Sequence, residues 1–312
     1  MSRSSNVRRE APSQSFGTDV VHLQYDVDAP PPLASPSHAR FVILSDTHST
    51  EPEVPDGDVL MHCGDLTDIG TQHSFERFLD WFRSHPHQTK IAIAGNHDFA
   101  ADNKTGWYDR KGRSIHRQFN EPQADTARVS ELLREKRSDG FVYLEDERYS
   151  FSIAREGIRD RVWNVYGSPW TPKFGGWAWN HERGAEAKKL YANVPTDVDL
   201  LLTHGPPHGF GDLDVIRYGR SHVGCEELTR KLTAGELSPR IHAFGHIHEA
   251  RGMFRQQWPR ENHRPHHDRH APNTLFINAA LADMDAARSQ AHQTFKYRVQ
   301  HQPIIVDLDC RL

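Results

Sequence analysis

Cysteine is scarce in this 312-residue sequence. The three cysteines, Cys63, Cys225 and Cys310, are far apart and include no Cys-x-x-Cys pair, which argues against a zinc ribbon and against a disulfide framework. So small and odd a number is typical of a protein kept in a reducing compartment. The sequence therefore predicts a cytoplasmic protein, with a nuclear location left open.

Long apolar runs and basic tracts are also missing. The polar, basic start of the chain lacks the apolar stretch that a secretory signal needs, and no run approaches the ~20 apolar residues that cross a bilayer. The formal net charge is −4, and the 38 Lys and Arg are interspersed with the 42 Asp and Glu. We therefore expect no membrane partner, and nucleic acid is not the expected partner either.

Short apolar runs, by contrast, recur along the chain and predict buried strands. Between them lie helical patterns near 125–137, 184–192 and 224–234. A fourth helix is predicted after Thr71 or Ser74, either of which is the expected cap. Its apolar face would consist of Phe75, Phe78, Leu79 and Phe82. Strands that alternate with helices predict an α/β fold. The predicted strands cover 41–44, 59–61, 91–94, 200–202, 241–244, 275–277 and 304–306.

Two segments have a different composition from the rest. Residues 1–39 are rich in Ser and Pro, which predicts an N-terminal tail, largely extended or disordered, in which 20–25 is able to form an edge strand. Residues 40–308 are expected to form the folded domain, with a polar insertion near 255–273. We expect a surface loop there, and binding of a third ion is the alternative. The histidines of this insertion are His263, His266, His267 and His270.

Five of the predicted strands end in residues able to bind metal ions. In open α/β sheets, sites form beyond the carboxyl ends of strands, so side chains distant in the chain can meet there. The Asp-x-His and His-x-His spacings put both side chains of each pair on the same side of an extended segment. Glycines at 64, 95, 205 and 245 are expected to let the backbone turn tightly. The candidate residues are Asp46 with His48, Asp65, Asn96 with His97, His204, and His246 with His248.

The residue types favour a two-metal site. Carboxylate oxygens and imidazoles suit Mn, Fe or Zn, and no thiolate stands at these strand ends. An aspartate has enough lone pairs on its two oxygens to bridge two ions. The sequence therefore predicts a dinuclear site for divalent metal ions.

In order and spacing, these residues resemble the calcineurin-like metallophosphoesterase superfamily. From roughly Arg40 to Leu308 the chain is similar to the metallophosphoesterase-domain-containing group, itself similar to class III cyclic-nucleotide phosphodiesterases. The resemblance implies a four-layer α/β sandwich, with two mixed β-sheets flanked by helices. The stretches that carry it are 43–48, 94–98, 167–172, 203–207, 223–225 and 244–249.

The resemblance also implies roles for the candidate residues. One ion would be held by Asp46, His48, Asp65 and His248, and the other by Asp65, Asn96, His204 and His246. His97 would protonate the leaving-group oxygen, and Asp98 would orient the His97 ring. The ions would be Mn or Fe, with Zn or Mg as alternatives, and a water held between them would lose a proton and attack phosphorus.

Two features of the motifs bear on activity. Many relatives have Glu where this chain has Asp98, which puts the orientation of His97 in question. Some relatives lack the histidine that is His246 here, and its presence favours an active enzyme.

The expected substrate is a small-molecule phosphate ester, and the expected reaction is hydrolysis of a phosphodiester, with cyclic nucleotides as one class. A phosphomonoesterase or protein phosphatase with the same metals is an alternative, as is a scaffold protein on the same fold. Trp170 is expected either to stack on a substrate or to pack the core. His208 and Arg217, in the loop after His204, are expected to contact phosphate or substrate.

Overall fold

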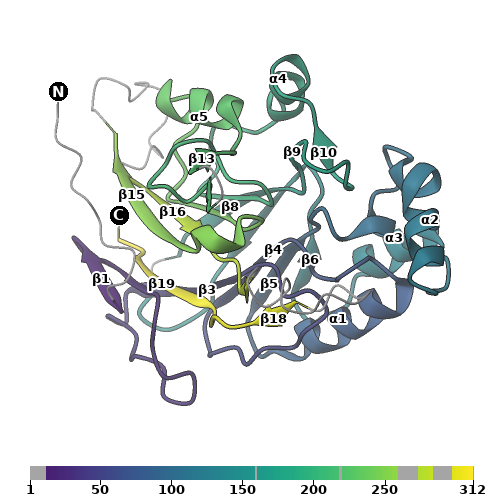
Figure 1. Cartoon of the computed structure of the whole chain (residues 1–312). Helices are drawn as coiled ribbons and strands as arrows, with labels where there is room; N and C mark the ends of the chain where they lie inside the picture. Colours follow the sequence, from purple (N-terminus) through teal and green to yellow (C-terminus); the bar gives the residue numbers. More distant parts are fainter. Residues whose placement is uncertain (1–11, 159, 218–219, 259–272, 284–296, 312) are drawn as a thin grey trace.

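Two mixed β-sheets packed face to face form the centre of the computed structural model (Figure 1), which describes residues 12–158, 160–217, 220–258, 273–283 and 297–311. The larger sheet has seven strands in the order β1 (Ser13–Phe16), β2 (Asp19–His22), β19 (Ile304–Asp309), β3 (His38–Leu44), β4 (Val59–Cys63), β5 (Thr89–Ile93) and β6 (Phe141–Tyr143). The other has six, in the order β15 (Gly252–Gln257), β16 (Asn273–Asn278), β14 (Ile241–Phe244), β11 (Leu200–Thr203), β8 (Val162–Ser168) and β7 (Glu147–Ser152).

The strands that end near the candidate residues run parallel. In the larger sheet β3, β4, β5 and β6 are parallel, whereas β19 is antiparallel to β3. In the six-stranded sheet β8, β11, β14 and β16 are parallel, and β7 and β15 are antiparallel edge strands. Parallel neighbours place their carboxyl ends at one edge of each sheet.

Alternating side chains of each central strand supply two different apolar layers, because successive residues point to opposite faces of a sheet. Phe41 and Ile43 of β3 join the core between the sheets, while Val42 and Leu44 face the helices outside the larger sheet. In β11, Leu200 and Leu202 enter the same central core. A strand that is buried on both faces is apolar at every position, which is why these strands are continuous apolar runs.

Helices cover the outer face of each sheet (Figure 1). α1 (Gln72–Ser84) and α3 (Thr126–Arg134) pack on the larger sheet, and α4 (Ala185–Tyr191) and α5 (Glu226–Thr233) pack on the six-stranded sheet. The predicted four-layer α/β sandwich is therefore confirmed. The short elements are η1 (Phe99–Ala101), η2 (Tyr108–Gly112), α2 (Arg113–Gln118), η3 (His248–Ala250) and the strand pairs β9 (Thr171–Pro172) with β10 (Asn180–His181), β12 (Val215–Ile216) with β13 (Ser221–His222), and β17 (Ala282–Asp283) with β18 (Arg298–Val299).

The helix predicted from its apolar spacing is α1. Phe75, Phe78, Leu79 and Phe82 are buried on one face, and the side chain of Thr71 caps the helix by accepting the N–H of Ser74. The other predicted helices correspond to α3, α4 and α5, and each predicted apolar run forms a strand. Local periodicity was therefore a sufficient guide to these elements.

The N-terminal segment departs from the prediction of a tail at 1–39. Residues 13–16 and 19–22 form strands, and β2 pairs with both β1 and β19, so it lies inside the larger sheet and not at its edge. Burial of Val21 explains why this segment orders. Residues 1–11, and residues 259–272 of the predicted His-rich insertion, lie outside the described residues; 255–257 belong to β15 and Asn273 begins β16.

In the part of the chain that the structure describes, no helix combines the length and apolar character needed to cross a membrane. The cytoplasmic location stays a prediction.

Candidate metal centre

The predicted ligand residues meet where the carboxyl ends of both sheets come together. Asp46 and His48 follow β3, Asp65 follows β4, and Asn96 follows β5, all in the larger sheet. From the six-stranded sheet come His204 after β11 and His246 with His248 after β14. Backbone hydrogen bonds join neighbouring loops: the amide of Asp46 donates to Gly64, and the amide of Gly245 donates to His204.

The first cluster consists of Asp46, His48, Asp65 and His248. One ligand atom from each lies within 4.8 Å of the others. Nε2 of His48 is 3.4 Å from Nε2 of His248, and the latter is 3.0 Å from Oδ1 of Asp46. Two imidazole nitrogens that face each other beside buried carboxylates form a donor set that suits a cation.

The second cluster consists of Asp65, His204 and His246, again with ligand atoms within 4.8 Å of one another. Nε2 of His204 is 3.4 Å from Oδ1 of Asp65 and 2.8 Å from Oδ1 of Asn96. Nδ1 of His204 donates to the carbonyl of Cys63 at 2.9 Å, which leaves Nε2 as the nitrogen that faces the cluster. Asp65 belongs to both clusters, as expected of a bridging carboxylate.

The backbone brings the paired ligands together differently from the prediction. The Asp-x-His pair was expected on one side of an extended segment, but Asp46 has φ 57° and His48 has φ 45°, after β3 has ended. Asp65 (φ 53°) and His246 (φ 68°) are also left-handed. Each such residue costs about 1–3 kcal/mol, which a folded protein tolerates where function requires the geometry. Turned backbone, and not strand alternation, makes these side chains converge.

Gly245 is required by close approach to a predicted ligand. A Cβ atom at this position would lie 2.0 Å from Oδ2 of Asp46 and 2.1 Å from Oγ of Ser45. The amide of His246 also donates to both carboxylate oxygens of Asp46, at 3.1 and 3.0 Å. The glycine of the Gly-His-x-His motif therefore makes room for the Asp46 carboxylate.

Charge in the clusters fits bound cations. Although burial opposes ionisation, His204 and His97 hold the pKa of Asp65 well below its usual value. Burial likewise opposes charge on His204, yet Asp65 raises its pKa to about 9. Burial, with the nearby His204, lowers the pKa of His246 to about 3, so this ring is a neutral donor. Divalent ions would replace the protons that now offset the buried carboxylates.

His97 lies beside the clusters and is held at both its backbone and its ring. Its amide donates to Oδ1 of Asp65 at 2.7 Å, and its Nδ1 is 2.7 Å from the carbonyl oxygen of Asp68. Trp177 stacks on the ring with centroids 4.9 Å apart. Since a carbonyl only accepts, Nδ1 carries a hydrogen, and Nε2 is the nitrogen available for proton transfer.

Asp98 has partners other than the one predicted for it. Its carboxylate accepts the backbone N–H groups of Gly95, Leu66 and Thr67, and the hydroxyl of Thr67. It therefore joins the loops after β4 and β5, and the carbonyl of Asp68 takes the orienting position at Nδ1 of His97. A short carboxylate in a tight loop reaches backbone donors more readily than the ring beside it.

Asp68 and Tyr297 border the site, and the sequence interpretation missed both. Oδ1 of Asp68 lies 3.7 Å from Nδ1 of His48, a nitrogen that is buried without a hydrogen-bond partner among the described residues. Burial, with Asp65 and Asp98 nearby, raises the pKa of Asp68 to about 8. Asp68 follows the Gly-Asp motif by three residues, which was a usable signal, whereas no motif flanks Tyr297.

The predicted substrate residues have different surroundings. Nε1 of Trp170 donates to Oδ2 of Asp146 at 2.8 Å, and its ring packs edge-on against Trp179, as in a packing residue. The ring of His208 lies 5.3 Å from that of His222. The amide of Arg217 donates to Oε1 of Glu249 at 3.4 Å, beside His248. Contact of any of the three with substrate stays a prediction.

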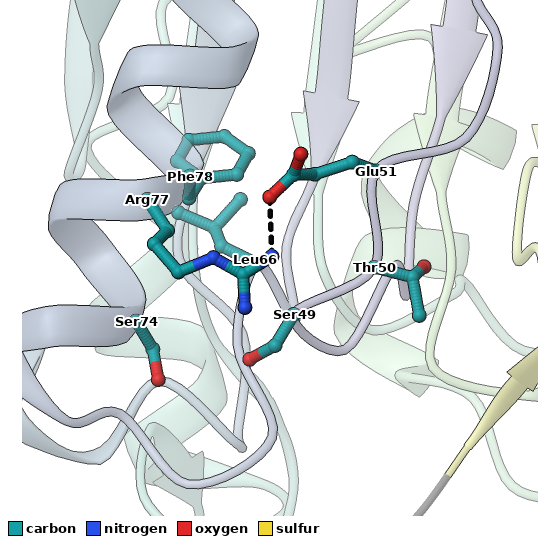
Figure 2. Close-up of a pocket in the computed structure, with 7 residues that line it drawn as sticks. All are labelled: Ser49, Thr50, Glu51, Leu66, Ser74, Arg77 and Phe78. Carbon is teal, nitrogen blue, oxygen red and sulfur yellow. Dashed lines mark hydrogen bonds and ion pairs between the residues drawn. The ribbon is translucent and has the colours of Figure 1, made fainter.

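A small pocket lies next to the loop that carries His48 (Figure 2). Ser49, Glu51, Ser74 and Arg77 are among the residues that line it, and Glu51 forms an ion pair with Arg77. Oγ of Ser49 accepts the amide hydrogen of Asp68 at 3.1 Å. The pocket therefore borders the site through Ser49, but none of the predicted metal ligands lines it.

The fold and the clusters together define a class of protein: an α/β sandwich with a candidate dinuclear site for divalent ions at the edges of two sheets. The family model for the calcineurin-like phosphoesterases matches residues 39–250, and the chain belongs to this family. It is accordingly a metal-dependent phosphoric ester hydrolase.

Similar proteins agree with the predicted group. The chain is 33% identical over 290 residues to Metallophosphoesterase domain-containing protein 1 of Homo sapiens, across 90% of this chain and 73% of that protein. It is 30% identical over 274 residues to a UPF0046 protein of Caenorhabditis elegans, across 86% of this chain and 80% of that protein. A match of 37% over 213 residues to a probable rhamnogalacturonate lyase C of Emericella nidulans covers 68% of this chain but 17% of that protein. The resemblance to the metallophosphoesterase-domain-containing group is confirmed.

Proposed function

We propose that the chain is a dinuclear phosphodiesterase that hydrolyses a small phosphodiester, and that cyclic nucleotides are the first class to test. The observation that supports this is the shared position of Asp65, whose carboxylate belongs to both the Asp46–His48–His248 cluster and the His204–His246 cluster. Asn96 would complete the second set through Oδ1. Two ions, when bound, would polarise the phosphate and activate a water for attack on phosphorus.

The chain's own residues would supply the proton for the leaving group. Nδ1 of His97 is committed to the carbonyl of Asp68, so Nε2 would donate to the leaving-group oxygen as the P–O bond breaks. The Asp65 oxygen that accepts the His97 amide ties this donor to the bridging ligand. General acid catalysis of this kind is typically worth ~10²–10⁴-fold.

Apolar surface beside the clusters favours a diester over a monoester. The ring of Tyr297 covers His48, and that of Trp177 covers His97. A diester carries one negative charge and a second organic substituent, whereas a monoester dianion calls for additional positive charge at the same place. Mn or Fe is the proposed metal, because nitrogen and oxygen donors suit both.

Paired substrates would test the proposal. Metal-stripped protein, with and without Mn²⁺, would be assayed on a nitrophenyl monoester and a bis-nitrophenyl diester. We expect Mn²⁺-dependent turnover that favours the diester, and loss of that turnover in Asp65→Asn. The matched control is His73→Ala, on the exposed surface of α1, which should behave as the parent protein.

The outcomes separate the alternatives. Turnover that favours the monoester would support a phosphomonoesterase or protein phosphatase with the same metals. No turnover of either substrate, together with no bound divalent ion, would favour a scaffold protein on this fold.

A further inference from the structure

Tyr297 lies against the candidate metal centre although it is far in the sequence from every predicted site residue. Its ring stacks on that of His48, with centroids 3.6 Å apart and planes at 16°. Its hydroxyl oxygen is 3.3 Å from Nε2 of His97. It also meets His248 edge-on, with centroids 5.5 Å apart. One side chain therefore contacts two proposed metal ligands and the proposed proton donor.

The hydrogen bond to His97 has a defined direction. Because Nδ1 of His97 donates to the carbonyl of Asp68, Nε2 of the neutral ring is an acceptor, and the Tyr297 hydroxyl donates to it. When His97 is an imidazolium, Nε2 carries a single hydrogen, which the hydroxyl oxygen accepts until a leaving-group oxygen replaces it as the acceptor. A hydroxyl is able to form both bonds, so the contact serves His97 before and after proton transfer.

Contacts at both ring nitrogens determine where Nε2 points. A hydrogen bond at Nδ1 alone still permits the imidazole to tilt about that bond, and a second hydrogen bond at the opposite nitrogen restricts the tilt. Trp177 limits motion on the face on which it stacks. A proton donor must lie within about 2.6–3.2 Å of the oxygen that it protonates, so a small tilt of the ring has a large effect on rate.

We propose that Tyr297 is a positioning residue for phosphate ester hydrolysis, which holds Nε2 of His97 toward the leaving-group oxygen and keeps the His48 ring in its orientation. This rests on the proposed function, in which His97 is the proton donor. As the P–O bond to the leaving group breaks, the proton on Nε2 passes to the departing oxygen and an alcohol leaves. The Tyr297 hydroxyl keeps its own proton and then donates to the neutral Nε2.

This role has a consequence that depends on the leaving group. An alkoxide needs a proton to depart, whereas a nitrophenolate is stable without one. Loss of the Tyr297 hydroxyl should therefore slow hydrolysis of alkyl esters selectively. A residue that only packs against the site would affect both kinds of ester alike.

The test compares Tyr297→Phe with the parent protein, both loaded with Mn²⁺, on two diesters that share one substituent and differ in the leaving group, nitrophenyl or alkyl. We expect kcat/KM to fall roughly tenfold for the alkyl ester and less than about twofold for the nitrophenyl ester, since one well-placed hydrogen bond is worth about a factor of ten. The Mn²⁺ content should not change, because the ring remains on His48. Tyr149→Phe, in the edge strand β7, is the matched control.

A combined variant shows whether Tyr297 acts through His97. His97→Ala should lose alkyl ester turnover, and adding Tyr297→Phe to it should cost nothing further. Unchanged alkyl ester turnover in Tyr297→Phe, equal losses on both esters, or additive losses in the combined variant would each overturn the inference. If His97→Ala itself hydrolyses the alkyl ester normally, the proposed proton donor fails, and the inference fails with it.

Discussion

Oδ1 of Asp68 lies 3.7 Å from Nδ1 of His48, on the opposite side of the imidazole from the nitrogen that faces the first cluster. A carboxylate behind a ligand histidine orients the ring and raises its basicity. Positive charge at the cluster would favour the ionised form of Asp68 and strengthen this pairing.

Asp68→Asn should therefore weaken metal binding. Replacing such a partner typically costs ~10–100-fold in metal affinity, and we expect a loss in that range for Mn²⁺, measured by titration calorimetry of the metal-stripped protein. Asp80→Asn, on the exposed face of α1, is the control and should bind as the parent does. An unchanged affinity in Asp68→Asn would show that this carboxyl does not support His48.

Asp98 should contribute to stability and not to the proton affinity of His97. Its carboxylate accepts hydrogen bonds from two loops, so Asp98→Asn, which keeps only one acceptor oxygen, should lower the free energy of unfolding by about 1–3 kcal/mol in urea. The shape of the pH–rate profile should stay the same, because Nδ1 of His97 is held by Asp68. A shifted profile would restore the orienting role predicted from the motif.

A buried ion pair between Arg40 and Asp307 should stabilise the larger sheet. Nε and a terminal nitrogen of the guanidinium donate to the two carboxylate oxygens, each at 2.8 Å, and both side chains are buried. Breaking such a pair typically costs about 3–5 kcal/mol. We expect the free energy of unfolding of Asp307→Asn, measured by urea denaturation at pH 7, to be lower than that of the parent by this amount. Asp197→Asn removes a similar but exposed pairing with Arg148 and should cost less than about 1 kcal/mol.

The same pair should show a defined pH dependence. Burial raises the pKa of Asp307, but the hydrogen bonds from Arg40, with His22 nearby, outweigh it and lower the pKa below its usual value. The stabilisation that the ionised Asp307 gives the folded state is therefore complete above the carboxyl group's unfolded pKa of about 3.9. It is lost as the pH falls through the lower pKa of the folded state. The difference in stability between the parent and Asp307→Asn should narrow below about pH 4. A difference that stays constant with pH would contradict this assignment.

His242 should make the fold sensitive to moderate acid. Burial in β14 lowers its pKa to about 3, and its Nε2 is 2.9 Å from the hydroxyl of Thr203. Since the unfolded pKa is about 6.5, stability from the neutral ring is present above that pH and is lost as pH falls toward the folded pKa. Between pH 7 and 5, the free energy of unfolding should change less steeply with pH in His242→Asn than in the parent protein. The control His73→Asn, on the exposed face of α1, should keep the parent slope.

Strand ends explain why so much of the candidate site was predictable. A buried strand must be apolar throughout, so the first polar residues after β3, β4, β5, β11 and β14 stand out in the sequence. Parallel strands place these ends together, and the order of motifs then indicated the family. Strand periodicity did not reveal that the backbone at Asp46 and His48 turns into the left-handed region. The ligands were predicted to converge, but by the wrong backbone geometry.

The sequence by itself determined the central strands, the main helices and the residues able to bind two ions, because these depend on local periodicity and on residue type. Only the tertiary structure decided which groups surround those residues. Tyr297 reaches His97 across 200 residues of chain and stacks on the still more distant His48, and Asp98 takes backbone partners 31 and 32 residues away. Such contacts depend on how distant loops pack, and no local pattern encodes that packing.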